Sequence, residues 1–369
     1  MAEGCGVSRS NPVVAGIDGS RSAVEAARWA AADARRRGVP LRLVYAYESS
    51  GRDYPTLEVT AAEVREAMRE TGVRRLSVAG KTAAEIAPGL DITTEVVEGD
   101  PKAVLVKESR QATLVVLGSR GLGSVGRFLL GSCGLAVAAH GQCPLVIVQD
   151  GDSRPGPVLV GVDGWPASAA AVRFAFQEAS ELGTSVTALR TWSELGPVQP
   201  GVRRLGGSRV VHDSERRALA VEVSSVAREY PDVPFGCLVV RGRPGKALRE
   251  YGERAGLIVV GTRGRSGFAG MLLGSVSQGL AARAPCPIAV VRADTGIPRP
   301  HSNERKQNMN DIENARAAKE ARDAIAAGAG PSRSSGELAE AAMRKYFAAE
   351  TYRAKKSEEL SEEDEERSS

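Results

Sequence analysis

One pattern of glycines occurs twice in this chain and constrains its fold more than any other feature. An apolar run, 114–117 or 257–260, is followed by two glycines three positions apart; nine intervening residues then separate the second glycine from a Gly-Ser that opens a helix-like segment. The pattern residues are Gly118, Gly121, Gly131 and Ser132 in the first copy, and Gly261, Gly264, Gly274 and Ser275 in the second. Such glycines let backbone N–H groups and a helix N-terminus approach a phosphate. We therefore predict two phosphate-binding strand-loop-helix units.

The duplication extends over a whole domain. Asp18-Gly19, after the first apolar run, returns as Asp163-Gly164 at an offset of 145 residues, and the glycine loops are offset by 143 residues. The Gly-x-Pro turn at 99–101 and the Cys-Pro at 143–144 also return, at 242–244 and 286–287. A nearly constant offset through all these landmarks indicates that a complete domain has been duplicated.

Each half alternates strand-like and helix-like segments. Short apolar runs without alternation predict strands buried on both faces, and helical spacing predicts the helices between them. In the first half the expected strands are 13–17, 41–46, 92–97, 114–117 and 145–148, and the expected helices are 23–37, 57–87 as one or two helices, 101–110 and 133–140. This alternation predicts an open α/β sheet with right-handed crossovers.

We expect three parts in the chain: a first domain over 1–150, a second over 151–294, and a polar tail over 295–369. Two stretches of the tail, 311–327 and 337–356, have helix-forming composition but few large apolar residues, and the acidic end is typical of disorder. The simpler interpretation is a solvated tail that is partly helical or disordered. The alternative is a partner-binding helix around 343–352.

Composition argues against several classes of protein. A formal net charge of +4 over 369 residues predicts no general nucleic-acid surface. No stretch approaches the roughly 18 apolar residues of a membrane span, and the start lacks the apolar segment of a signal peptide. The cysteines are scattered without the spacing of a disulfide framework or zinc site, at Cys5, Cys133, Cys143, Cys237 and Cys286. We expect a cytoplasmic protein without nucleic-acid or membrane partners, in which Cys143 and Cys286 are small buried hydrophobes.

With these motifs the chain resembles a tandem universal stress protein of the ATP-binding type. That family's signature is G-x2-G-x9-G-[S/T], and Asp18-Gly19-Ser20, Gly99-Asp100-Pro101 and Cys143-Pro144 also look familial. The resemblance covers about residues 11–293. It implies two repeated Rossmann-like or flavodoxin-like domains, each with a five-stranded parallel sheet, and ATP across the strand ends. It also implies that the last strand of each domain is available for pairing, within the chain or in a homodimer.

The resemblance also implies site residues beyond the glycine loops. Asp18 is expected near the ribose, the phosphates or a bound Mg²⁺, and backbone around Ala46 is expected to face adenine; Asp163 and Thr191 are the second counterparts. The second repeat departs from the pattern at Trp165 and Arg243, which stand where the first has Ser20 and Asp100. The aspartates also suit turns or helix caps. The loop arginines Arg120, Arg127 and Arg263 suit either phosphate contact or solvent. We assign no catalytic residue and no protein-borne metal site.

Three functions follow from these residues. The first is an ATP-binding regulatory protein of the stress response whose nucleotide occupancy changes its contacts with an unknown protein partner. The second is a slow ATPase or phosphotransfer enzyme that uses Asp18 and Asp163 to hold Mg²⁺ through water. The third is an interaction scaffold with relic nucleotide sites. The sequence favours binding over turnover, because no nucleophile-base grouping accompanies the glycine loops.

Overall fold

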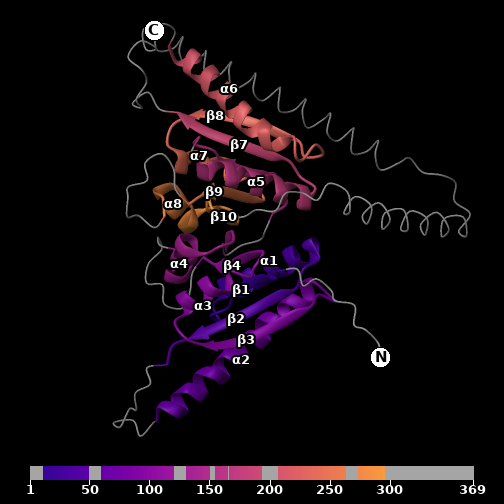
Figure 1. Ribbon diagram of the computed structural model, residues 1–369, viewed down its shortest axis with the longest axis vertical. Helices are drawn as coiled ribbons and strands as arrows, with labels where there is room; N and C mark the ends of the chain where they lie inside the picture. The colour runs from indigo at the N-terminus through magenta and orange to yellow at the C-terminus, as the bar shows by residue number, and fades with distance from the viewer. Residues whose placement is uncertain are drawn as a thin grey trace, which may run out of the picture. The chain divides into compact units, whose positions relative to one another are not determined.

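The structure is a computed structural model of the whole chain, drawn in Figure 1. It describes residues 11–49, 60–119, 130–149, 154–164, 166–192, 207–262 and 273–295. The tail with its two expected helices lies outside the described residues, as do Cys5, the loop arginines, Trp165 and the two loop glycines Gly121 and Gly264.

Both repeats follow the predicted order of elements. The first contains β1 (Val13–Gly16), α1 (Arg21–Arg37), β2 (Leu41–Tyr47), α2 (Ala61–Ile86), β3 (Ile92–Glu98), α3 (Pro101–Glu108), β4 (Leu114–Gly118), α4 (Ser132–His140) and β5 (Leu145–Val148). The second contains β6 (Val158–Gly161), α5 (Pro166–Leu182), β7 (Val186–Trp192), α6 (Gly207–Ala227), β8 (Phe235–Arg241), α7 (Pro244–Gly252), β9 (Leu257–Gly261), α8 (Ser275–Arg283) and β10 (Ile288–Val291). Most element ends lie within two residues of the predicted ones.

The ten strands form one sheet rather than two separate ones. Its order is β3-β2-β1-β4-β5-β10-β9-β6-β7-β8 (Figure 1). Within each repeat all five strands are parallel, as predicted, whereas β5 and β10 pair antiparallel at the centre. The last strand of each repeat is therefore paired with its counterpart in the same chain.

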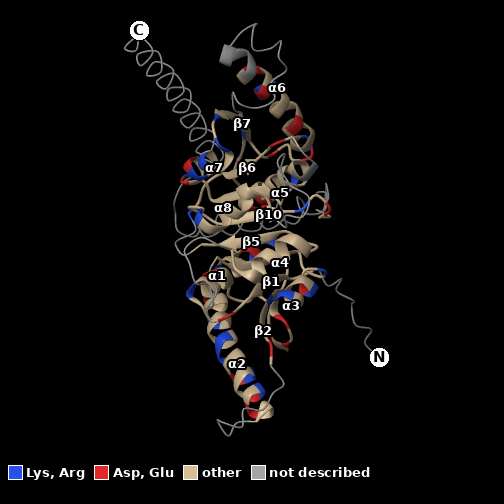
Figure 2. Ribbon diagram, turned by 90° about the vertical axis from the view of Figure 1, so that its left-hand side faces the viewer, with Lys and Arg blue, Asp and Glu red and all other residues tan. Residues whose placement is uncertain are grey.

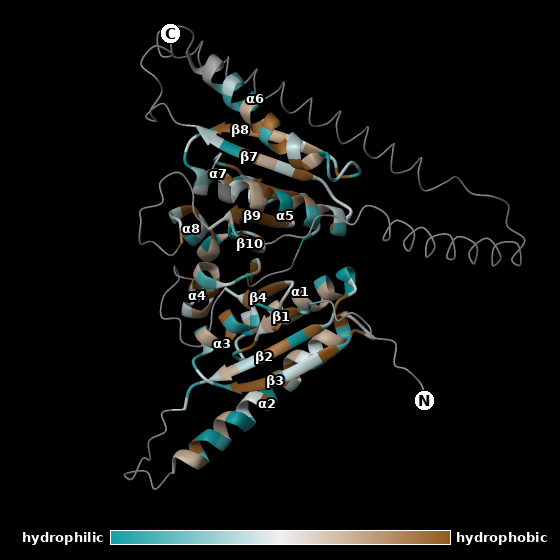
Figure 3. Ribbon diagram, viewed as in Figure 1, coloured by the Kyte–Doolittle hydropathy of each residue, from teal (hydrophilic) through white to brown (hydrophobic). Residues whose placement is uncertain are grey.

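Two apolar cores cover the two faces of this sheet. Alternate strand residues such as Val13 and Val14 point to opposite faces, and each belongs to a different core. One core is formed against α1, α2, α5 and α6, and the other against α3, α4, α7 and α8. The inner strands are buried on both sides, whereas the residues of β3 and β8 at the two ends of the strand order are nearly all exposed or partly exposed. The brown, hydrophobic colour of the inner strands in Figure 3 follows this pattern.

The long polar segment after β2 forms one helix rather than two. A capping box begins α2, because the Thr60 hydroxyl accepts from the Glu63 N–H while Glu63 bonds back to the Thr60 N–H. Charged pairs one turn apart, such as Glu66 and Arg69, follow along the helix; Figure 2 shows its alternating red and blue bands. Gly72 does not break it. A side chain at Gly72 would collide with the ring of Tyr45, so glycine lets α2 pack closely on β2.

Candidate functional site

The predicted site residues of the first repeat that the structure describes lie where the carboxyl ends of β1, β2 and β4 meet. β1 pairs with β2 on one side and with β4 on the other, and all three strands run in the same direction. Chain connections leave β1 and β4 toward opposite sides, which makes this the topological switch point where open α/β sheets bind ligands. Asp18 follows β1, Ala46 lies near the end of β2, and Gly118 ends β4.

The Asp18 turn is built by its own neighbours. The backbone N–H of Ser20 donates to Asp18 Oδ1 at 2.8 Å, and Gly19 between them has a φ of 89°, a left-handed conformation that favours glycine. Ser20, not Ser22, is the N-cap of α1, since its hydroxyl accepts from the Ala23 N–H at 3.2 Å. Asp18 thus forms the turn that starts α1, and its side chain remains partly exposed.

The two ends of the first glycine loop differ in what surrounds them. A Cβ on Gly118 would lie 2.6 Å from the carbonyl carbon of Ser22, so close packing of β4 on α1 requires glycine there. A Cβ on Gly131 would meet nothing within 4 Å among the described residues. Gly131 is the N-cap of α4 and carries no side-chain cap, while Ser132 beside it is exposed. Among the described residues, nothing therefore lies against the Gly131 position at the start of α4.

The Asp18 turn and the start of α4 are near each other. The pKa of the Cys133 thiol, in the first turn of α4, is raised first by burial and further by the negative charges of Asp100 and Asp18, while the Ser132 hydroxyl acts against this shift. The Asp18 carboxylate is thus within electrostatic reach of the open helix end. The fold brings together two sequence features that lie more than a hundred positions apart.

The end of β2 borders the same place. β1 stops pairing at Gly16, opposite Val44, and the last bond between the two strands runs from the Ile17 N–H to the Val44 carbonyl at 2.8 Å. β2 continues beyond this point, so the backbone at Ala46 projects past the end of β1, beside the Asp18 turn. The second repeat has the same geometry: the Val162 N–H donates to the Leu189 carbonyl, and Thr191 lies beyond.

The second site differs at its aspartate. The Ser168 hydroxyl donates to the Asp163 carboxylate and accepts from the Asp163 N–H at 3.0 Å. Ser168 is buried in α5, and its equivalent in the first repeat is Ala23, which has no hydroxyl. The Asp163 carboxylate therefore has a hydroxyl partner at a position where the first repeat has an alanine. At the loop, the Gly274 N–H donates to the Thr262 carbonyl at 2.8 Å.

A group of side chains that packs against the Asp18-Gly19 turn was not predicted from the sequence. Its residue types differ between the two repeats. In the first repeat, the Arg75 guanidinium carbon lies 5.5 Å from the ring centroid of Tyr45, and Nη1 donates to the Tyr45 hydroxyl at 3.3 Å. A Cβ on Gly19 would touch the Arg75 side chain. The Arg75 side chain therefore packs against the Asp18-Gly19 turn. Gly72 of α2 borders this ring, and Ala79 of the same helix is buried in the same apolar core.

The second repeat replaces this aromatic group with an ionic one. Arg190 stands where the first repeat has Tyr45, and Glu215 and Glu222 stand where it has Gly72 and Ala79. The buried Arg190 guanidinium pairs with Glu222 and, at 3.6 Å, with Glu215. Its Nη2 atom lies near Gly164 of the Asp163 turn. The two repeats therefore differ together at three equivalent positions.

Arg243 changes a helix end rather than the strand edge. Its counterpart Asp100 caps α3 by accepting from the Lys102 N–H at 3.1 Å, whereas Arg243 makes no side-chain cap on α7. The structure does not describe Trp165, so the effect predicted for it is untested.

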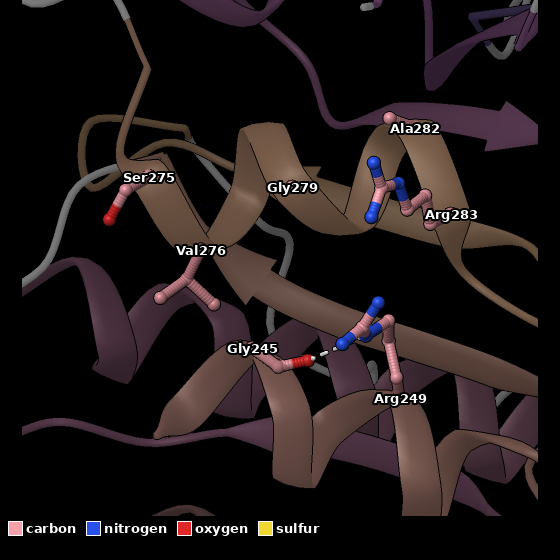
Figure 4. Close-up of a pocket in the computed structure, with 7 residues that line it drawn as sticks. All are labelled: Gly245, Arg249, Ser275, Val276, Gly279, Ala282 and Arg283. Carbon is pink, nitrogen blue, oxygen red and sulfur yellow. Dashed lines mark hydrogen bonds between the residues drawn. The ribbon is translucent and has the colours of Figure 1, made fainter. Parts of the chain in front are cut away.

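A groove of about 300 Å³ lies between α7 and α8, beside the predicted site residue Ser275. Its lining residues are Gly245, Arg249, Ser275, Val276, Gly279, Ala282 and Arg283. Figure 4 shows the Arg249 and Arg283 side chains approaching each other across it, with Ser275 at the opposite end. Arg249 Nε donates to the Gly245 carbonyl at 3.3 Å. The equivalents of Gly245 and Arg249 in the first repeat are Lys102 and Val106, so the groove differs between the repeats.

In the ranges that the structure describes, no three His, Cys, Asp or Glu side chains gather in a metal-binding group. None of the described helices is both long and apolar enough to serve as a membrane span.

The fold and the strand-edge loops define a class: a tandem, doubly wound α/β protein with a glycine loop at the switch point of each half. Comparison with known proteins gives the family. The model of the universal stress protein family matches residues 10–149 and again 156–292, so this chain belongs to that family.

Relatives and solved structures agree with this assignment. A universal stress protein of Mycobacterium tuberculosis is 35% identical over 294 residues, which cover 77% of this chain and 98% of that protein. One from Mycolicibacterium smegmatis is 35% identical over 288 residues, covering 76% of this chain and 96% of its own length. The crystal structure of a universal stress protein from Archaeoglobus fulgidus matches with a TM-score of 0.58 and 20% identity, over 77% of this chain and 97% of that one. This last similarity establishes the fold alone.

Proposed function

We propose that this protein is an ATP-binding regulatory protein of the stress response, and that the first repeat is its stronger nucleotide site. The observation that carries the proposal is the open start of α4 at Gly131, within electrostatic reach of Asp18. A helix N-terminus without a side-chain cap offers unpaired N–H groups and a positive partial charge to a phosphate. Its position at the switch point of the sheet favours a ligand there.

Each predicted residue has a role in this proposal. The first N–H groups of α4 and the Ser132 hydroxyl hold phosphate oxygens, and backbone around Ala46 faces the base. The partly exposed Asp18 carboxylate is a suitable oxygen ligand for Mg²⁺, directly or through water, together with the phosphates. Mg²⁺ would neutralise phosphate charge. ATP occupancy would then change the surface around the glycine loop and with it the contacts to a regulatory partner.

We expect weaker binding at the second repeat. The Asp163 carboxylate already accepts from Ser168, so a ligand or a hydrated Mg²⁺ must compete with that hydrogen bond. The Arg190 guanidinium is balanced by Glu215 and Glu222 beneath the Asp163 turn, which places two carboxylates where the first repeat has Gly72 and Ala79. Two carboxylates outnumber the one guanidinium in this group, and the remaining negative charge disfavours a triphosphate at the Asp163 turn.

Isothermal titration calorimetry with ATP and Mg²⁺ tests this proposal. Gly131→Val places a branched side chain in the open space above α4 and should weaken binding by at least tenfold, whereas Gly274→Val should affect only a weaker second phase. Gly236→Val is the matched control. Gly236 also has nothing within 4 Å of a Cβ among the described residues, but it lies on the edge strand β8, so this variant should bind like the wild type. Equal affinity in all three variants contradicts nucleotide binding at these loops and favours the scaffold.

A single-turnover hydrolysis assay separates the binder from the slow ATPase. We expect bound ATP to be recovered intact after many hours. Hydrolysis that is lost in Asp18→Asn while ATP affinity is retained would replace the first function with the second.

A further inference from the structure

A buried ionic cluster joins the two repeats on one face of the sheet, where α1 approaches α5. Glu178 of α5 is fully buried, and it accepts from Arg37 of α1 and, at 3.3 Å, from Arg36. Asp33 of α1 is also buried and accepts from Arg37 Nε at 2.7 Å. Four charged groups therefore meet across the junction, and each buried carboxylate has an arginine partner.

The electrostatics make the four groups interdependent. Burial disfavours the charged form of Arg37, but the carboxylates of Glu178 and Asp33 outweigh burial and raise the pKa of the guanidinium. Burial raises the pKa of the Glu178 carboxyl, and the two arginines counteract that shift. A buried carboxylate without a cation is costly, so the junction needs its arginines.

Both arginines come from the first repeat. Asp33 and Glu178 are equivalent residues at an offset of 145, and the left-handed glycines Gly38 and Gly183, at the same offset, anchor this alignment. At the same offset Arg36 and Arg37 correspond to Glu181 and Leu182. The pairing face of the second repeat thus carries an acidic cluster, while that of the first supplies the cations for both.

The pairing of β5 with β10 does not distinguish a first repeat from a second repeat. Val146 and Ala289 are equivalent residues at the offset of 143, and they lie directly opposite each other in β5 and β10. Two first repeats or two second repeats from different chains have the same backbone available for an antiparallel pair. Such pairings would link chains end to end, which is the hazard of an open sheet edge.

We propose that the cluster of Asp33, Arg36, Arg37 and Glu178 selects the partner of the second repeat, so that its pairing face accepts a first repeat and rejects a copy of itself. Two second repeats would bring together two copies of Glu178 and two of Glu181, with no cation at the positions equivalent to Arg36 and Arg37. Specificity then comes from repulsion in the wrong pair as well as attraction in the right one. The proposal is independent of nucleotide binding.

A charge exchange within the full chain tests the contact. Arg37→Glu and Glu178→Arg each leave like charges buried together and should lower Tm by at least about 5 °C. The double variant Arg37→Glu/Glu178→Arg restores an opposite pair and should recover at least half of that loss. Arg35→Glu is the matched control, because Arg35 is exposed on the same helix turn and its reversal should leave Tm near the wild-type value.

Mixing two variants tests partner choice. The variant Arg36→Glu/Arg37→Leu gives the first repeat the residues of the second, so neither pairing face of that chain carries the two arginines. The variant Glu178→Arg keeps both arginines in its first repeat and makes the pairing face of its second repeat basic. Each variant alone should pair poorly within its own chain. Mixed together, they should form a two-chain species of twice the 38.7 kDa chain mass in sedimentation analysis, since each supplies what the other lacks. Arg35→Glu mixed with Glu178→Arg should not.

The proposal fails if the single reversals keep the wild-type Tm, or if the double variant recovers nothing. It also fails if Arg36→Glu/Arg37→Leu associates with itself as readily as with its complement. If the single variants are insoluble, the charge-exchange double variant decides: a soluble, stable double variant supports the proposal, and an insoluble one contradicts it.

Discussion

Val146 in β5 lies opposite Ala289 in β10, and the two residues hold the same position in their repeats. The repeats therefore meet about a local twofold axis. The contacts that flank this pair are similar: the Gln149 side chain donates to the Ala281 carbonyl at 2.9 Å, and its equivalent Arg292 donates to the carbonyl of Ala139, one residue after Ala138, the equivalent of Ala281. The backbone at the junction is nearly symmetric, so differences between the repeats depend on side chains.

The first prediction separates a glycine required by packing from one that is not. Gly118→Ala should lower the free energy of unfolding by roughly 1–3 kcal/mol, because its Cβ would lie 2.6 Å from Ser22 backbone. The Cβ of Gly131→Ala would meet no described residue within 4 Å, so this variant should cost less than about 1 kcal/mol, the usual effect of alanine at an N-cap. Urea unfolding followed by circular dichroism measures both. A loss for Gly131→Ala as large as for Gly118→Ala would contradict the open helix end.

The second prediction concerns the ionic group of the second repeat. Glu222→Ala should destabilise the protein by about 1–3 kcal/mol, because it removes a main partner of the buried Arg190; the lower half of this range applies since Glu222 is partly exposed. Replacing all three residues with those of the first repeat, by Arg190→Tyr, Glu215→Gly and Glu222→Ala, should cost less than Arg190→Tyr alone. Thermal unfolding compares them. A triple variant less stable than Arg190→Tyr would show that the three residues do not act together.

The third prediction uses the difference between two helix starts. Asp100→Ala removes the side-chain cap of α3 and should cost about 1 kcal/mol, and Arg243→Asp should add a cap to α7 and stabilise the protein by a similar amount. Arg243 is exposed and Asp100 is partly exposed, so neither change should disturb the packing of the core. Chemical unfolding at fixed ionic strength measures them. Changes of the same sign in both variants would argue against the cap as the cause.

The fourth prediction concerns the two buried thiols. Burial raises the pKa of Cys143 and of Cys286 to about 12, so the folded protein should hold both as inert thiols at pH 8. A maleimide at pH 8 should label them only after denaturation, as peptide mass mapping would show. Unfolded thiols ionise near pH 8.5, so between about pH 8.5 and 12 the unfolded state releases protons that the folded state keeps, and stability should fall as pH rises. Rapid labelling of Cys143 or Cys286 in the native protein would contradict their burial.

Much of the fold was predictable because the relevant signals are local or repeated. Apolar runs bounded by turn residues located the strands, and α1 ends at Gly38, which the structure shows in a left-handed conformation. The duplicated loop pattern led to the family, which the comparisons confirm. The predicted site residues Asp18, Ala46, Gly118, Gly131 and Ser132 come to one sheet edge. ATP binding there is still a prediction.

Other features were not predictable from the pattern of one repeat. The merging of two sheets depends on long-range pairing of β5 with β10, which no local pattern encodes. The sequence predicts one or two helices in 57–87, and the structure shows the single helix α2; close packing on Tyr45 accounts for a glycine at position 72 within it. Trp165 and Arg243 were the expected marks of a different second site, whereas the described differences there are Ser168 and the Arg190 group.

The sequence by itself determined the duplicated α/β architecture, the position of the glycine loops on the fourth strand of each repeat, and the buried character of its last strands, because these follow from hydrophobic spacing and turn chemistry along the chain. Only the tertiary structure decided which residues meet. Arg37 and Glu178 are 141 positions apart, and their partnership depends on two helices brought together by a strand pair. The same holds for Asp18 and the start of α4. The energies of these contacts depend on burial and on charge, and both act through space and not along the sequence.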